Sequence, residues 1–219
     1  MFAVIFDMDG VIFDSERATY EGWQEIADKY GFTDLWTPYR QCIGVNYERT
    51  KEIFLDFYGD DFPFVEYCRE QSENYHRKYD GGNLPVKKGV RELLSFLKEQ
   101  GCYTAVASST RTQTVTAQIR DAGLLPYFQT IIGGDRIKCS KPAPDIFLKA
   151  AEGIKEADKT AIYVIEDSYN GIRAAHAAKM HPIMVPDMLP ATDEMEELAD
   201  VVLPDLTEVI GYLQNRECK

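Results

Sequence analysis

The sequence contains no long hydrophobic run and comparatively few basic residues, and both shortages exclude classes of protein. No stretch approaches the ~20 consecutive apolar residues that a membrane-spanning helix needs, and the apolar run near the N-terminus is interrupted by Asp7. The 219 residues include 24 basic and 36 acidic side chains, so the formal charge is -12. Such a charge repels nucleic-acid phosphates and anionic lipid. We therefore expect neither a nucleic-acid partner nor a membrane location.

Cysteine and histidine are also scarce. The cysteines are odd in number and include no C-x-x-C pair, which indicates neither a disulfide framework nor a zinc ribbon; they are Cys42, Cys68, Cys102, Cys139 and Cys218. The three histidines are scattered without metal-ligand spacing, at His76, His176 and His181. This cysteine usage is typical of a reducing compartment, and we expect a cytoplasmic protein.

Short apolar runs that alternate with helical patterns predict the fold class. Runs of strand length lie at 2–6, 103–107, 130–133, 161–165, 183–185 and 201–203. Helical patterns lie between most of them, for example at 89–99 and 112–122. Buried strands that alternate with helices are typical of a parallel sheet covered on both faces. The sequence therefore predicts an α/β fold with a doubly wound parallel sheet.

One interval breaks this alternation because residues 15–79 contain no strand-like run. Ser15 and Thr37 are candidate helix N-caps, and further helical patterns cover 46–58 and 63–79. The interval therefore predicts a helical insertion between the first and second strands.

The insertion predicts two domains. We expect a helical cap domain at 15–82 and a core domain made of 1–14 and 83–219. Asp14-Ser15 and Gly81-Gly82-Asn83 are the expected hinges, since glycine tolerates large changes of the backbone.

Two carboxylates, Asp7 and Asp9, stand one residue apart where the first apolar run ends. Ligands of open parallel sheets bind at the carboxyl ends of the strands, so both side chains could reach one crevice. The same letters also suit an ordinary Asp-Gly turn at Gly10. The pair alone leaves both interpretations open.

Two further segments carry groups suited to an oxyanion. Ser108, Ser109 and Thr110 follow the run at 103–107, where hydroxyls and N–H groups at a helix start could bind an anion or simply cap the helix. Lys141 lies on a proline-rich loop, where it could neutralise a phosphoryl charge or remain a solvated surface lysine.

A second pair of carboxylates, Glu166 and Asp167, ends the run at 161–165. Facing Asp7 and Asp9 in a crevice of low dielectric, these groups would repel strongly, so a cation is implied. A set of oxygen ligands with few histidines favours Mg²⁺.

These motifs occur together in a known family. The segments D-x-D-G-V-x-x-D-S-E, the Ser/Thr after the second strand, K-P-x-P-D-I-F and E-D-S-x-x-G-I-x-A-A-x-A-A resemble the haloacid dehalogenase (HAD) superfamily of phosphotransferases. More narrowly, they resemble its β-phosphoglucomutase and phosphoglycolate phosphatase-like branch, which has a Rossmann-like core and a helical cap. The resemblance runs from Phe2 to about Val185.

The resemblance implies a role for each motif. Asp7 would attack the phosphorus and form an aspartyl-phosphate, and Asp9 would be the general acid and base. Mg²⁺ would be bound by the Asp7 carboxylate, the Asp9 main-chain carbonyl and Asp167, with Glu166 as a direct or water-mediated ligand. The phosphoryl oxygens would be held by Ser108, the amide of Ser109 and Lys141.

Two departures from the mutase pattern favour a phosphatase. Thr19 stands where the phosphoglucomutases have a cap-hinge histidine, and the stretch 43–47 stands where they have Lys-Gly-x-x-Arg. The histidine, the lysine and the arginine are therefore all missing here. A mutase needs such cations to hold a second phosphate. We expect a phosphatase for a small phosphate monoester such as a sugar phosphate; a β-phosphoglucomutase-type mutase is the alternative, and a non-catalytic phosphate- or metal-binding regulator is a remote one.

Four further residues are candidates for substrate contact. Gly44 and Tyr47 lie in the expected substrate-facing loop of the cap. Arg111 could reach a phosphate or pair with a carboxylate, and Asn170 could brace the Asp167 loop or favour the turn. We expect the cap to close over a monomeric enzyme.

Overall fold

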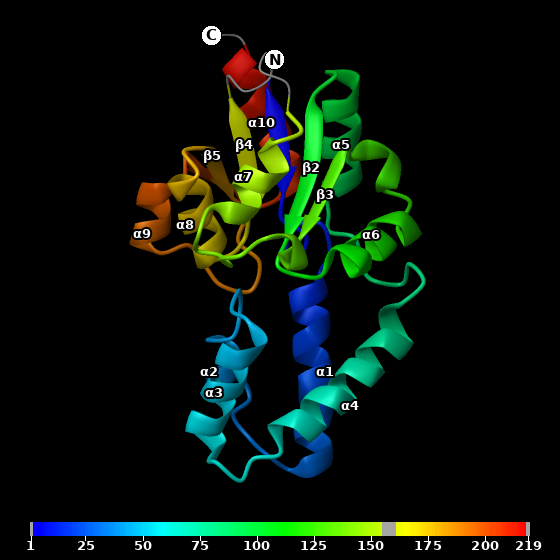
Figure 1. Ribbon diagram of the computed structural model, residues 1–219, viewed down its shortest axis with the longest axis vertical. Helices are drawn as coiled ribbons and strands as arrows, with labels where there is room; N and C mark the ends of the chain where they lie inside the picture. Colours follow the sequence, from blue (N-terminus) through cyan, green and yellow to red (C-terminus); the bar gives the residue numbers. More distant parts are fainter. Residues whose placement is uncertain (1, 155–160, 218–219) are drawn as a thin grey trace.

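The computed structural model describes residues 2–154 and 161–217 and contains a six-stranded sheet (Figure 1). The strands are β1 (Ala3–Phe6), β2 (Tyr103–Ser108), β3 (Thr130–Gly133), β4 (Ile162–Glu166), β5 (His181–Met184) and β6 (Val201–Val202). Their order is β3-β2-β1-β4-β5-β6, and each neighbouring pair is parallel. The chain thus winds outward from β1 in both directions, which confirms the doubly wound α/β fold.

Helices cover both faces of the sheet. Because successive side chains of a strand point to opposite faces, each strand contributes apolar side chains to two separate clusters. Val4 and Phe6 of β1 belong to one apolar cluster, whereas Ala3 and Ile5 belong to another. The first cluster contains side chains of α5 (Val90–Glu99), α6 (Thr112–Asp121) and α10 (Leu206–Glu217). The second contains side chains of α7 (Asp145–Ala151) and α8 (Tyr169–Ala177).

Short elements complete the sheet region. Helix α9 (Asp193–Leu198) packs on α8 through Met195 and Ile172, and the two 3₁₀ turns are Leu125–Tyr127 and Gly134–Arg136. Cys218 lies outside the described residues. Within the part of the chain that the structure describes, no helix combines the length and the apolar character that crossing a bilayer requires.

Four helices form a cap beyond the carboxyl ends of the strands (Figure 1). They are α1 (Ser15–Tyr30), α2 (Trp36–Tyr39), α3 (Tyr47–Tyr58) and α4 (Phe64–Tyr79). Their own apolar cluster is largely aromatic and centres on Trp23, Phe54 and Phe64. The cap therefore has a core distinct from that of the sheet, as expected for a helical insertion.

The two connections between sheet and cap run side by side. The N–H of Asp14 donates to the carbonyl of Pro85 at 2.9 Å, and the N–H of Lys87 donates to the carbonyl of Ile12 at 2.9 Å. Between them, Phe13 and Val86 form an antiparallel bridge. This pairing ties the entry and exit of the cap together; the domain boundaries at 15 and 82 stay a prediction.

Two of the expected helix caps are wrong. Asp14, not Ser15, is the N-cap of α1. Helix α2 begins at Trp36, and the Thr37 hydroxyl donates to Asp34 Oδ1 at 2.9 Å instead of capping a helix. A hydroxyl residue can bond to another side chain as readily as to a helix start: Thr37 bonds to a nearby turn residue, and Ser15 bonds to Asp9.

Candidate active site

A cavity of about 310 Å³ separates the carboxyl ends of the strands from the cap. Both parts of the molecule supply its walls. The sheet side supplies Asp7, Asp9, Ser109, Thr110, Lys141, Asp167 and Ser168, and the cap supplies Glu16, Thr19, Trp23, Tyr39, Cys42, Gly44, Val45, Thr50 and Phe54. The sequence motifs, which we expected to meet at one crevice, thus lie together at this edge of the sheet.

The loop after β1 brings the first two carboxylates to the cavity. The N–H of Asp7 donates to the carbonyl of Ile165 at 2.9 Å, which extends the pairing of β1 with β4 by one residue. The chain then turns at Gly10, whose φ is +77°. A Cβ at Gly10 would lie 2.3 Å from Asp167 Oδ2, so only glycine permits this approach of the loop to Asp167.

Asp9 is held by hydroxyl groups. Its Oδ1 accepts from Ser15 Oγ at 2.7 Å, and its Oδ2 accepts from Thr110 Oγ1 at 3.1 Å and Ser108 Oγ at 3.2 Å. Ser15 belongs to the first turn of α1. The orientation of the Asp9 carboxylate therefore depends on both the cap and the loop after β2.

Lys141 is a buried cation between two carboxylates. Its side chain is 6% exposed, and its Nζ donates to Asp7 Oδ1 and, at 2.5 Å, to Glu166 Oε1. Burial alone would lower the pKa of Lys141, but the carboxylates of Asp7 and Glu166 raise it above its ordinary value. The ammonium group thus stays charged and points at the carboxylate of Asp7.

Glu166 is enclosed at the start of helix α8. Its Oε2 accepts from the N–H of Asp167 at 3.0 Å and from the N–H and hydroxyl of Ser168 at 2.9 and 3.0 Å. A Cβ at Gly171 would lie 1.8 Å from Glu166 Cδ, so the glycine leaves the space that this side chain fills. These donors, together with Lys141, account for both carboxylate oxygens of Glu166.

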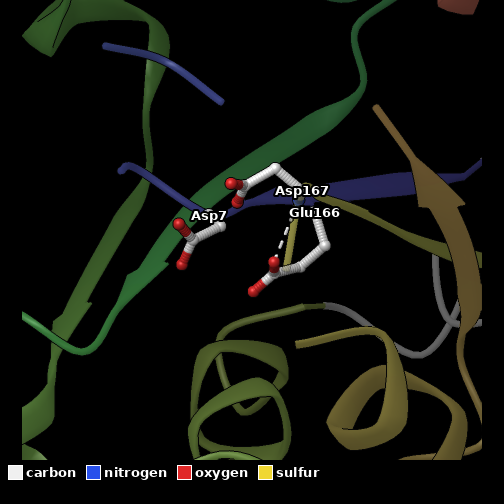
Figure 2. A group of neighbouring side chains, drawn as sticks. All are labelled: Asp7, Glu166 and Asp167. Atoms are coloured by element: carbon white, nitrogen blue, oxygen red, sulfur yellow. Dashed lines mark hydrogen bonds between the residues drawn. The ribbon is translucent and has the colours of Figure 1, made fainter. Parts of the chain in front are cut away.

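Three carboxylates converge beside the cavity (Figure 2). Asp7, Glu166 and Asp167 are buried, and one oxygen of each lies within 4.8 Å of the others. Burial is the largest cause that raises the pKa values of Asp7 and Asp167 well above the ordinary value, and neighbouring carboxylates raise them further. For Asp7, the ammonium group of Lys141 opposes part of this rise in pKa.

A bound cation would offset this repulsion. Oxygen ligands from carboxylates are those that Mg²⁺ prefers, so the residues fit the expected metal. Glu166 already has protein donors on both oxygens, whereas Asp7 and Asp167 line the cavity. The Asp9 carboxylate points to the hydroxyls instead of to this cluster, so only its main chain is left as a candidate ligand.

The structure separates the candidate phosphate-binding residues into two groups. Ser109 and Lys141 line the cavity. Ser108 is fully buried beneath them, where its Oγ accepts from the N–H of Thr110 at 3.0 Å while bonded to Asp9. Ser108 is therefore placed to orient the loop and Asp9, and its contact with a phosphoryl group stays a prediction.

The candidate substrate residues are also spread apart. Gly44 lines the cavity, and its carbonyl accepts from Asn170 Nδ2 at 3.2 Å, which links the cap loop to α8. Tyr47 is 49% exposed and packs on Phe64 with ring centroids 5.6 Å apart. Arg111 is exposed at the N-cap of α6. Tyr47, Arg111 and Asn170 lie outside the cavity lining.

Several cavity residues escaped the sequence analysis, and the polar ones on the cap include Glu16 and Tyr39. Glu16 is the last letter of the D-S-E segment, so the motif itself could have indicated it. Tyr39 carries no local signal because it reaches the cavity from α2, where its hydroxyl donates to the Glu16 carbonyl at 3.0 Å. Burial, followed by Asp9 and Asp187, raises the pKa of Glu16 to about 8.

Comparisons with known proteins agree with this geometry. The family profile described as haloacid dehalogenase-like hydrolase matches residues 4–185. A phosphorylated carbohydrates phosphatase of Thermotoga maritima is 31% identical over 84% of this chain and 84% of its own. A protein of Drosophila melanogaster named as a probable pseudouridine-5'-phosphatase is 31% identical over 84% of this chain and 80% of its own.

A solved structure extends the likeness to nearly the whole chain. A Thermotoga maritima protein provisionally named a β-phosphoglucomutase superposes with a TM-score of 0.78 at 28% identity, covering 98% of this chain and 99% of the other. Because the family profile covers most of the sequence, the chain belongs to the haloacid dehalogenase-like hydrolases. The resemblance stated from the motifs is thereby confirmed.

Proposed function

We propose that this hydrolase is a Mg²⁺-dependent phosphatase that cleaves a small phosphate monoester through an aspartyl-phosphate on Asp7. The observation that carries the proposal is the buried contact of Lys141 with Asp7 and Glu166 at the wall of the cavity between sheet and cap. The named phosphatases among its relatives support the same reaction class.

Asp7 is the proposed nucleophile. Its carboxylate lines the cavity while Lys141 bonds to Oδ1, so the ammonium group orients the carboxylate and favours its ionised form. Attack by Asp7 forms a bond from its oxygen to phosphorus as the bond from phosphorus to the ester oxygen breaks. Water then attacks the same phosphorus, which releases inorganic phosphate and restores Asp7.

Asp9 is the proposed acid and base. It lines the cavity with Asp7, and its hydroxyl partners hold it there. A proton on the Asp9 carboxyl passes to the departing ester oxygen, and the resulting carboxylate takes a proton from the attacking water. Such proton transfer contributes about 10²- to 10⁴-fold to the rate.

The proposed metal site uses the carboxylates of Asp7 and Asp167, with the main-chain carbonyl of Asp9. Glu166, held by the start of α8, positions Lys141, and it would contact the metal directly or through water. A bound Mg²⁺ supplies positive charge to the phosphoryl oxygens, which is the chief need of phosphoryl transfer. The acidic protein thereby accepts an anionic substrate.

The cap supports a small substrate. A volume of about 310 Å³ is at the lower end of the range for small-molecule sites, which suits a sugar phosphate better than a macromolecule. All the proposed catalytic groups come from one chain, so a monomer is sufficient for the reaction. We retain the cytoplasm as the proposed location.

A phosphosugar mutase is the second candidate, since one solved relative carries that name. A mutase must hold a second phosphate in the cap. Among the described residues that line the cavity, the cap supplies no lysine, arginine or histidine. This wall favours the phosphatase.

A phosphorus NMR time course tests the proposal. The protein would be incubated with Mg²⁺ and a panel of small phosphate esters, including β-glucose 1-phosphate with a trace of its bisphosphate. Growth of inorganic phosphate, abolished in Asp7→Asn, is the expected result. Conversion of the 1-phosphate to the 6-phosphate without phosphate release would establish the mutase instead, and an inert protein would support a regulator.

A further inference from the structure

The cap wall of the cavity contains an unusual pair of polar groups. Glu16 is partly buried in the first turn of α1, and Tyr39 of α2 is 4% exposed. Both line the cavity. The Tyr39 hydroxyl donates to the main-chain carbonyl of Glu16 at 3.0 Å and lies 3.4 Å from its Oε2.

This bonding leaves both cavity-lining residues with oxygen acceptors. Because the Tyr39 hydroxyl has its single proton directed at Glu16, it can only accept from a ligand. A carboxyl group of Glu16 also accepts through its oxygens, whether it is ionised or not. We propose that Glu16 and Tyr39 select an uncharged, polyhydroxylated leaving group by accepting hydrogen bonds from its hydroxyl groups.

The proposal rests on the proposed phosphatase function and adds a rule for its substrate. A sugar or polyol hydroxyl offers the proton that these acceptors need. A carboxylate or second phosphate offers only acceptor oxygens. The Glu16 carboxyl, whose pKa is raised to about 8, can place at most one proton between them, and the Tyr39 hydroxyl directs its own proton at Glu16. The selection is therefore against charge on the leaving group.

The rest of the wall gives a second reason for that selection. Lys141 is the only cation among the described residues that line the cavity, and it is already paired with Asp7 and Glu166. An anionic leaving group would thus have no positive partner in the cap. Trp23 and Phe54 provide the apolar surface against which the C–H face of a sugar packs.

A simpler role for Glu16 is to stabilise the start of helix α1, as acidic residues in a first turn do. A solvent-exposed carboxylate can fill that role, so the role does not require a place in the cavity. Glu16 instead lies in the cavity near other acidic groups, where burial raises its pKa. A costly position of this kind is typical of a functional group.

Two matched pairs of esters test the rule: glucose 6-phosphate against 6-phosphogluconate, and glycerol 3-phosphate against 3-phosphoglycerate. Phenyl phosphate has no sugar or polyol hydroxyl groups, so its hydrolysis measures phosphoryl transfer without the proposed contacts to Glu16 and Tyr39. With Mg²⁺ present, we expect kcat/KM to favour the uncharged member of each pair by at least about 100-fold.

Variants then assign the preference to residues. Glu16→Met and Tyr39→Phe should each raise KM for the uncharged esters by about tenfold, the size expected for one lost hydrogen bond to a polar group, while kcat/KM for phenyl phosphate changes less than twofold. Glu21→Met, at an exposed glutamate on the same helix, is the matched control and should leave all five esters unchanged.

The outcomes separate this rule from the phosphatase proposal. No phosphate release from any of the five esters would overturn the proposed function. Release without a preference for the uncharged members, or a preference that survives in both variants, would overturn the selection by Glu16 and Tyr39 and leave the phosphatase intact.

A variant that gains activity tests the same rule even if Glu16 or Tyr39 variants fold poorly. Thr50 lines the cavity from α3, and Thr50→Lys places a cation on the cap wall. We expect it to raise kcat/KM for 6-phosphogluconate and 3-phosphoglycerate by at least tenfold. An unchanged value in a folded variant would contradict the claim that the missing cation sets the preference.

Discussion

The two walls of the cavity are formed by different kinds of side chain. The sheet wall brings together Asp7, Lys141 and Asp167, whose charged or chargeable side chains are buried. The cap wall consists of aromatic, apolar and uncharged polar side chains, with Glu16 as the exception among the residues described.

This difference reflects how each wall is supported. The sheet wall stands at the ends of neighbouring strands, where the ladder fixes the positions of Asp7 and Glu166 relative to one another. The cap wall is carried by helices with a separate aromatic core, joined to the sheet by a short paired junction. Strongly interacting charges need the rigid support, whereas recognition of a leaving group tolerates a cap that moves.

The largest effect is expected on the sheet wall at its nucleophile. Asp7→Asn should lower kcat for every ester by at least about 10⁴-fold, because the amide cannot form the acyl phosphate. Phosphate release measures the loss, and circular dichroism should show an unchanged fold because the amide removes a buried repulsion. Activity above 1% of the original would contradict the assignment of Asp7.

Asp9 should show a loss that depends on the leaving group. Asp9→Asn removes the proton donor, so kcat for glucose 6-phosphate should fall by about 10²- to 10⁴-fold. For p-nitrophenyl phosphate, whose leaving group needs no proton, the fall should be clearly smaller. Steady-state rates for both esters check this, and an equal loss for both would argue against an acid role.

Lys141 should stabilise the folded protein as well as take part in the chemistry of the sheet wall. Lys141→Met leaves Asp7 and Glu166 buried without their cation, which should lower the free energy of unfolding by about 3–5 kcal/mol. Urea unfolding with EDTA measures this change. Lys138→Met, an exposed lysine on the same loop, is the control and should change stability by less than about 0.5 kcal/mol.

The smallest effect is expected on the cap wall. The pKa of Glu16 is raised to about 8 in the folded protein, so the folded state keeps a proton that the unfolded chain loses near its ordinary value. The free energy of unfolding of the original protein should therefore fall, relative to that of Glu16→Gln, as pH rises from about 5 to about 8.5.

Because Glu16 is only partly buried, this relative change should be on the order of 1 kcal/mol. Urea unfolding of both proteins with EDTA across this range measures it. Asp7 and Asp167 titrate in both proteins, so their contributions cancel in the difference. A difference that stays constant with pH would show that Glu16 titrates normally.

The sequence by itself determined the sheet and its chemistry. Strand-length apolar runs predicted both ends of each of the six strands to within two residues, because a short apolar run bounded by turn signals has the length of a buried strand and not of a helix. Asp7, Lys141 and Asp167 follow from local motifs at strand ends, and a parallel sheet brings such ends to one edge.

Only the tertiary structure decided the cap wall. Tyr47 was expected at the substrate, but it packs on Phe64 outside the cavity, while Tyr39 came to Glu16 across 23 residues of sequence. Helical patterns identify which residues are apolar without saying how two helices pack. The side chains that read the substrate therefore depend on the docking of helices, whereas those that perform the chemistry are encoded in local sequence.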